Sequence, residues 1–456
     1  MVVSRQQPEG DPYETLTEEC TLIVSAGFAN WHESFLASPP FSDRDHNRRS
    51  NTRWTGRFLA FVAILMAWDP AHALCDRFAT ARDVLAGMFP SRRRVGKTYQ
   101  GFIKALFWWS DSLLEKITEH LRSVIREKAG RYWTREGFVA FAADGSRVEC
   151  PRTEANEKAL GCAGRKGTGP QFWLTTLWHM GTGLPWVWKI GRSTDAERTH
   201  LRSMLQLLPC NALVVADAGF TGYELLRDIL SGGRSFLIRV GSNVHLLKEL
   251  GYAQVENDGT VYLWPQEFQK KRQSPLTLRL IVLERKGKKM YLLTNLSVEQ
   301  LSEKQAAVLY EMRWGVELFY RSMKQTLSHR KMLSHAPKQA RAELSWTLVG
   351  LQLLGLLSVD QIIRRRKDPL SWSVAASLRV VRLAMADRKP RRSCRGGFLG
   401  ALSRAVKDNY KRSSAKKARN WPHKKKEKSP GAPKLRNANS TEVKKAQTIK
   451  TTKMVA

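Results

Sequence analysis

The feature that most constrains the fold is a series of short apolar runs that begins at Gly137. The run GFVAFAADG has the residue types of a β-strand and ends with Asp144 and a glycine. Two further runs, QFWLTTLWHM and LPWVWKIG, flank Gly181-Thr182-Gly183, and small residues at such a position predict a tight turn between antiparallel strands. The sequence therefore predicts three strands, the last two joined as a hairpin.

Helix and strand patterns then alternate up to Val240. Thr194-Asp195-Ala196-Glu197 has the spacing of a capping box and predicts a helix that runs to about Leu208. ALVVAD is typical of a buried strand and ends at Asp217; a helix over Tyr223–Leu230 and the strand FLIRV follow. Three strands with a hairpin, then helix, strand, helix and strand, is the order of a ribonuclease H-like α/β domain, a mixed sheet with helices on its faces.

The remaining sequence divides into helical and β-rich parts. Apolar residues recur at three- and four-residue steps before residue 130 and again after about Ser302, which predicts helices, whereas VYLWP, LTLRLIVLE and MYLLTNL predict short strands. We therefore predict an α/β ribonuclease H-like core with a β-rich insertion, preceded by an all-α N-terminal region and followed by a disordered basic tail. The predicted divisions are 1–130 (helical), 131–240 (first part of the core), 241–296 (β-rich insertion), 297–387 (helical completion of the core) and 388–456 (tail).

The charge of the chain points to a polyanionic partner. The formal net charge is +35, from 76 Lys and Arg against 41 Asp and Glu. A phosphate backbone is the natural counterpart of such a surface. The segment from Arg388 onward holds 22 Lys and Arg and three acidic residues, with too few large apolar residues to form a core. We expect this tail to be disordered.

Cysteine usage and hydropathy give expectations about the compartment. The six cysteines are scattered without a Cys-x-x-Cys pair, which argues against a disulfide framework and against a zinc knuckle. The apolar run FLAFVAILMAW is too short to span a bilayer, and the N-terminus opens with Arg, Gln and Glu, unlike a signal peptide. We expect a soluble, cytoplasmic protein that makes no membrane contact.

Two carboxylates occupy the same kind of position. Asp144 and Asp217 each close an apolar run and precede a small residue, so they can meet a third carboxylate from a helix in one cleft. Mg²⁺ prefers such oxygen ligands, and two metal ions can promote cleavage of a phosphodiester. Each acid also has an ordinary explanation. Asp144 with Gly145 is a common turn pair, Asp217 can simply end its strand, and Glu317 can pair with Arg313 four residues earlier.

The segment YEMRWGVELFYRSMK adds a second constellation. A helix turns about 100° per residue, so Tyr310, Arg313, Glu317 and Lys324 would lie within an arc of about 60° on one side of a continuous helix. An aromatic hydroxyl, a carboxylate and two cations would then lie on one face of the helix. That combination indicates a functional site.

These residues resemble a known family, the DDE insertion-sequence transposases, specifically the group named after insertion sequence four. The resemblance rests on Asp144 in FAADGSR, on Asp217 in LVVADAGFTGYELL, and on the Tyr-x2-Arg-x3-Glu-x6-Lys pattern that starts at Tyr310. It covers about residues 135 to 360. The β-rich stretch at 241–296 resembles the insertion that these enzymes carry before the helix with the glutamate.

The resemblance implies a catalytic core and names its residues. Asp144, Asp217 and Glu317 would be catalytic and hold two Mg²⁺ ions, with Mn²⁺ as a substitute, and no covalent protein–DNA intermediate would form. Tyr310, Arg313 and Lys324 would bind phosphates of the element end. The partners would be double-stranded DNA, as element ends and target, and a second copy in a synaptic homodimer, without a small-molecule substrate. The protein would act at the nucleoid of a bacterial cytoplasm.

Further DNA-binding candidates lie in two basic loops, and each has an ordinary alternative. Arg92, Arg93, Arg94 and Lys97 precede a helix, as DNA contacts do, but also fit a solvated helix start. Arg165 and Lys166 lie in a Gly-rich loop that can equally be an exposed hairpin. The resemblance also implies a tryptophan that stacks a flipped base, and Trp264 is the best-placed candidate. The alternative is that Trp264 packs in the core. We expect His179 and His200 to be packing or surface residues instead of ligands, and we expect core roles for Trp173, Trp178, Trp186 and Trp188.

Two other functions remain open at this point. One is a catalytically inactive DNA-binding protein derived from a transposase, because the basic body and tail explain binding equally well. The other is an RNA-processing nuclease of the same fold. An excision assay distinguishes the first from an active enzyme, and competition between duplex DNA and RNA tests the second.

Overall fold

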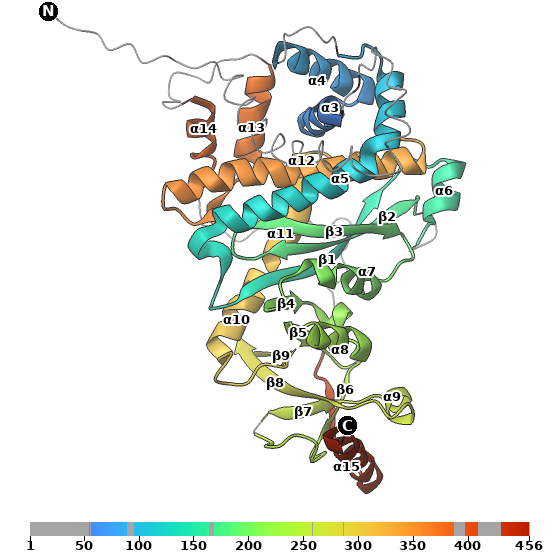
Figure 1. Ribbon diagram of the computed structural model, residues 1–456, viewed down its shortest axis with the longest axis vertical. Helices are drawn as coiled ribbons and strands as arrows, with labels where there is room; N and C mark the ends of the chain where they lie inside the picture. The colour runs from blue at the N-terminus through green and yellow to red at the C-terminus, as the bar shows by residue number, and fades with distance from the viewer. Residues whose placement is uncertain are drawn as a thin grey trace, which may run out of the picture.

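A single sheet runs through the computed structural model, which describes residues 54, 56–88, 95–163, 168–257, 259–285, 287–386, 397–408 and 430–455 (Figure 1). In these residues the strand order is β10-β6-β7-β8-β9-β5-β4-β1-β2-β3. The strands are β1 (Val139–Glu149), β2 (Gln171–His179), β3 (Leu184–Arg192), β4 (Ala212–Ala216), β5 (Ser235–Val240), β6 (His245–Lys248), β7 (Thr260–Leu263), β8 (Leu276–Arg285), β9 (Lys288–Thr294) and β10 (Lys434–Asn437).

The five strands β3-β2-β1-β4-β5 form one half of the sheet. β1, β2 and β3 are antiparallel, and the predicted turn at Gly181 to Gly183 joins the last two. β4 and β5 run parallel to β1. Every residue of β4, and of β1 from Val139 to Ala143, is buried, as expected for strands covered on both faces. The mixed sheet and its strand order agree with the predicted α/β core.

Helices surround this half of the sheet. α12 is the central one and packs against β3, α3 and α5, while α7 packs against β1, β2 and β3. The helices are α3 (Gly56–Trp68), α4 (Leu74–Met88), α5 (Tyr99–Ala129), α6 (Glu154–Leu160), α7 (Glu197–Met204), α8 (Tyr223–Ser231), α9 (Gln266–Lys270), α10 (Glu303–Met312), α11 (Trp314–Arg321), α12 (Pro337–Arg364), α13 (Val374–Met385), α14 (Gly397–Leu402) and α15 (Ser440–Val455).

The burial patterns of the two longest helices, α5 and α12, explain why both were predictable from the sequence. In α5 the buried residues follow steps of three and four, which is one face of an amphipathic helix, as predicted. In α12 nearly all residues from Leu344 to Val359 are buried. Its length and composition would suffice to cross a membrane, yet 83% of its most apolar window is buried inside the molecule. α12 is therefore a core helix around which the other helices pack.

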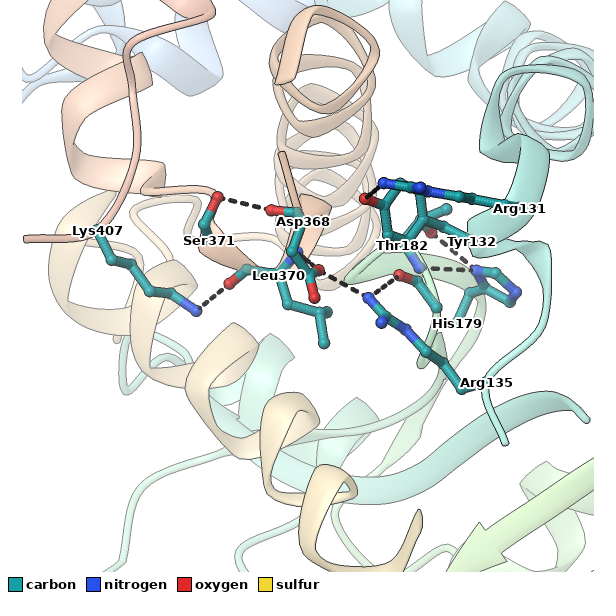
Figure 2. A network of polar contacts seen from close by, with 10 residues as sticks. Arg131, Tyr132, Arg135, His179, Thr182, Asp368, Leu370, Ser371 and Lys407 are labelled. Atoms are coloured by element: carbon teal, nitrogen blue, oxygen red, sulfur yellow. Dashed lines mark hydrogen bonds and ion pairs between the residues drawn. The ribbon is translucent and has the colours of Figure 1, made fainter. Parts of the chain in front are cut away.

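A polar network fixes the end of the β2–β3 hairpin (Figure 2). Arg135 donates to Asp368, which follows α12, at 2.7 Å and to the carbonyl of Gly181 at 3.3 Å. The His179 ring lies 2.8 Å from the Thr182 hydroxyl through Nδ1 and 3.1 Å from the Trp133 carbonyl through Nε2. The network ties the start of β1 to the hairpin and to the turn after α12.

The predicted β-rich insertion continues the same sheet. β5 pairs antiparallel with β9, and β9, β8 and β7 follow as antiparallel neighbours. β6 pairs with β7 through Leu247 and Tyr262. The insertion is thus hydrogen-bonded directly to the core strand β5 and shares its backbone ladder.

The prediction that residues 388–456 are disordered is wrong for the parts that the structure describes. α14 packs against α12 and α13, Lys434–Asn437 forms β10 parallel to β6, and α15 follows. Composition misled the prediction because β10 is held by its backbone and by a charge pair, not by large apolar side chains. Arg436 binds Glu442 through two hydrogen bonds, of 2.8 and 2.7 Å. Residues 387–396 and 409–429 lie outside the described residues.

Deleting residues 430–456 is expected to loosen β6. The deletion removes backbone hydrogen bonds such as those from Lys434 to Val244 (2.8 Å), from Ala438 to Lys248 (2.9 Å) and from Ser242 to Pro430 (2.8 Å). Each contributes about 1 kcal/mol. We expect faster hydrogen exchange at residues 242–248, with unchanged exchange in β1 and β4. Equal exchange of 242–248 in both proteins would contradict a stabilising role for β10.

Candidate active site

Two of the predicted acids lie on neighbouring strands. β1 and β4 are parallel, and the last pair in their register is Ala143 opposite Ala216. Asp144 and Asp217 each follow directly after this pair. Paired strands are about 5 Å apart, which brings the two backbones close. Asp144 was predicted to close its strand, and this is wrong: β1 continues to Glu149 because β2 remains paired with it. It is β4 that ends here, and Asp217 turns the chain into the short 3₁₀ helix η3 (Ala218–Phe220).

The third acid, Glu317, comes from α11, which packs against β1 and β2. The predicted continuous helix over Tyr310–Lys324 is wrong. α10 ends at Met312, α11 begins at Trp314, and a π-helical turn, η4 (Ser322–Thr326), carries Lys324. Arg313 keeps helical backbone angles (φ −51°, ψ −33°), but the hydrogen bonding shortens there, from the Val316 N–H to the Arg313 carbonyl, and widens to a π turn from Ser322. The arc calculated for one regular helix therefore does not apply.

The four side chains nevertheless reach the same place. The Tyr310 hydroxyl lies 3.4 Å from an Asp217 oxygen, and an Arg313 Nη lies 2.9 Å from Glu317 Oε1. Lys324 Nζ donates to the hydroxyl of Ser146, two residues after Asp144, at 2.8 Å. The predicted set of one hydroxyl, one carboxylate and two cations therefore faces the carboxylates of β1 and β4, although three separate helical pieces supply it.

Arg313 is the central cation of the site. Only 7% of the residue is exposed, and its guanidinium lies 5.5 Å from the centre of the Tyr310 ring. Burial would lower the pKa of Arg313, but Tyr310, Asp217 and Glu317 oppose that effect and the pKa is raised. The Arg313–Glu317 pair is therefore more than the solvated contact that the i, i+4 spacing alone suggests. Arg313 compensates several negative charges at once.

Burial gives the carboxylate of Asp144 an electrostatic cost. Burial raises its pKa to about 7, against the lowering effects of Arg313 and of a backbone hydrogen bond from Gly145. Glu317 and Glu197 add further repulsion. An ionised Asp144 is thus under-compensated by the protein's own cations, and a bound divalent cation favours the ionised form of such a carboxyl.

The donor set suits a hard divalent cation in its chemistry. Asp144, Asp217 and Glu317 offer carboxylate oxygens, the ligands that Mg²⁺ and Mn²⁺ take. Within the described ranges, however, no group of three or more His, Cys, Asp or Glu side chains is arranged so that it could hold an ion. Arg313 lies among the acids instead and pairs with Glu317.

The structure also places residues that the sequence predictions missed. The buried Tyr320 donates its hydroxyl to the carbonyl of Asp144 at 2.7 Å, which fixes α11 to β1. Its spacing, three residues after Glu317, was the available signal. Glu197 also lies beside the site, but the sequence assigned it to a capping box.

The remaining predicted residues have other surroundings. Arg92, Arg93, Arg94, Arg165 and Lys166 lie outside the described residues. Lys97 is exposed, and its carbonyl accepts a hydrogen bond from Arg82 at 3.4 Å. Trp264 is 3% exposed and donates to the carbonyl of Gln273 at 2.7 Å, which supports its core role. His200 is buried and contacts the Thr175 hydroxyl at 3.0 Å. The hairpin tryptophans are buried or partly buried: Trp173, Trp178, Trp186 and Trp188.

Two buried histidines give the fold a predictable response to acid. Burial lowers the pKa of His179 to about 4 and of His329 to about 3. Below about pH 6.5 the unfolded chain binds these protons and the folded chain does not, so stability falls as the pH falls. We expect each imidazole to remove about 2 kcal/mol between pH 6.5 and 5. Urea unfolding at pH 7 and pH 5 measures this loss. His329→Gln should reduce it, and equal losses in both proteins would contradict the assignment.

Known proteins similar to this chain are transposases. Residues 136–352 match the family model described as "Transposase DDE domain". The chain is 25% identical over 240 residues to transposase InsG for insertion sequence element IS4 of Escherichia coli strain K12; the match covers 50% of this chain and 52% of that protein, so the chain spans about half the length of this relative. The cryo-EM structure of the piggyBac transposase synaptic complex with hairpin DNA aligns with a TM-score of 0.40 and 13% identity, over 82% of each chain.

Proposed function

We propose that this chain is a DNA transposase, on the premise that residues 136–352 match the family model described as "Transposase DDE domain". It would bind the terminal inverted repeats of its insertion sequence, cleave the ends and join them to target DNA. The observation that carries the proposal is that Asp144, Asp217 and Glu317 all interact with the buried Arg313, inside the matched segment.

The acidic residues supply the cation site in this proposal. Asp144, Asp217 and Glu317 would hold Mg²⁺, with Mn²⁺ as a substitute. When bound, such ions activate a water or a 3′-hydroxyl and stabilise the leaving oxygen of a phosphodiester. Glu317 would have to exchange Arg313 for a cation, since the two side chains are paired at 2.9 Å. The guanidinium would then be available for DNA.

The basic and aromatic residues position the strand. Arg313 offers a planar fork that fits a phosphate, and Lys324 offers a point charge beside β1. Burial lowers the pKa of Lys324, and nearby phosphate would favour its charged form. Tyr310 would add a hydrogen bond to a phosphate from its position next to Asp217. Such contacts fix the register of DNA without reading its bases.

The surrounding parts take supporting roles in the same proposal. The strands β3-β2-β1-β4-β5 would form a ribonuclease H-like core, and the β6–β9 segment would be an insertion into it. The helices before residue 130 would recognise the element ends. Two copies would hold the paired ends in a synaptic dimer, and the protein would act in the cytoplasm at the nucleoid.

An excision assay tests this function against its main alternative. A net charge of +35 also fits a catalytically inactive DNA-binding protein. A plasmid that carries the element should release it when the protein and Mg²⁺ are present, and EDTA should stop the release. Retarded DNA without an excised element would support the alternative and overturn the proposal.

A further inference from the structure

A fourth carboxylate, that of Glu197, lies beside the proposed cation site. Glu197 is the first residue of α7, and α7 packs against β1 and η3, the elements that carry or follow Asp144 and Asp217. The residue is half-buried. Glu197 is not part of the sequence motif of the site, whose other residues lie on β4–η3 (Asp217) and on α10–η4 (Tyr310 to Lys324).

Two glycines show where the carboxylate lies. A Cβ atom on Gly145, the residue after Asp144, would be 2.4 Å from Glu197 Oε1. A Cβ atom on Gly219, two residues after Asp217, would be 3.3 Å from Glu197 Oε2. The Glu197 carboxylate therefore fits between the β1 backbone and the η3 turn, in space that only glycine at position 145 leaves open.

Glu197 does not serve as part of a helix cap, which is the role that the sequence suggested. The predicted capping box is wrong: α7 starts at Glu197, and its N-cap residue Ala196 offers no side-chain cap. Asp195 instead accepts the Arg192 N–H at 2.8 Å. Among the described residues the side chain of Glu197 makes no hydrogen bond or ion pair. The helix dipole favours an acid in the first turn but does not direct it towards two aspartates.

We infer that Glu197 supplies a fourth carboxylate ligand to the divalent cations of this site. The inference rests on the proposed function, because it requires that Asp144 and Asp217 bind cations. Electrostatics support it: burial and Asp217 raise the pKa of Glu197, while Arg147 opposes them. A partly desolvated carboxylate that lies close to other carboxylates and accepts no hydrogen bond is stabilised by a bound cation.

Cation binding by the full chain without DNA tests the inference directly. Mn²⁺ titration followed by electron paramagnetic resonance should show that Glu197→Gln weakens binding by about tenfold or more. Glu197→Asp, which keeps the charge on a shorter side chain, should bind with intermediate affinity. Glu154→Gln is the matched control, since Glu154 is an exposed acid in the first turn of α6. Wild-type affinity in Glu197→Gln would overturn the inference.

A second readout separates a ligand from a structural residue. Without cations, Glu197→Gln should melt at or slightly above the wild-type temperature, because it removes repulsion. The increase in melting temperature that Mn²⁺ produces should shrink, since a weaker ligand stabilises less. An undiminished increase would count against Glu197. If Asp217→Asn also leaves Mn²⁺ binding unchanged, the proposed site fails; if Asp217→Asn weakens binding and Glu197→Gln does not, only the role of Glu197 fails.

Discussion

Replacing Asp217 with asparagine is expected to reduce Mg²⁺-dependent cleavage of a labelled element end by about 10³-fold or more while DNA binding survives. Asparagine has the size of aspartate and can still accept the Ala218 N–H, which Asp217 Oδ1 accepts at 2.7 Å. The η3 turn should therefore keep its shape, and the charge alone is lost. Asp144→Asn and Glu317→Gln should behave in the same way, because all three acids would hold the same ions.

The comparison needs a control for the general effect of removing one negative charge. Asp228→Asn provides it, since Asp228 lies on α8 and pairs with Arg202 at 2.6 Å. This variant should cut at close to the wild-type rate. Gel retardation in the presence of EDTA measures binding separately from cleavage. Normal cutting by the Asp144, Asp217 and Glu317 variants would refute the catalytic assignment.

Gly315→Ala is expected to be the most damaging single-methyl change near the site. A Cβ atom there would lie 2.1 Å from the ring of Trp178, a buried residue of β2. Alanine in a helix gains about 1 kcal/mol over glycine, but overpacking of this kind costs about 1–3 kcal/mol. The close approach would also push α11 away from β2. Glu317, two residues further on, would shift with it, and such a displacement costs about 10²-fold in rate.

A second substitution distinguishes steric displacement from other causes. Trp178→Leu shortens the side chain that the new methyl group meets, so the double variant should recover part of the cleavage lost in Gly315→Ala. Trp178→Leu alone should lose stability through a cavity. A double-mutant cycle on unfolding free energy and on cleavage rate measures the coupling. Additive effects in both measurements would show that the contact does not determine the position of Glu317.

The core of the fold was predictable because its signals are local. Strand β4 is five buried residues in a row, and α5 repeats its apolar face over many turns. Such patterns require no knowledge of distant partners. Asp144 and Asp217 were recognised by the same route, since both end the apolar part of a strand pattern.

The failures have a common physical origin in tertiary contacts. α10 packs on β4 and β8, whereas α11 packs on β1 and β2. These contacts are with residues distant in the sequence, so the periodicity of the segment could not predict the division at Arg313. β10 is a strand because β6 offers it backbone partners, although its own four side chains are exposed. Glu197 matches a capping box in the sequence, yet α7 begins two residues later than that motif predicts and leaves the acid beside the site.

The interruption at Arg313 also connects the insertion to the carboxylates. α10 contacts β8 of the insertion, whereas α11 is anchored on β1 by the Tyr320 hydroxyl. A displacement of β8 would therefore reach Tyr310 through α10, whereas Glu317 would stay with β1. Arg313 lies against the Tyr310 ring and pairs with Glu317, so the two sets of contacts join at this residue.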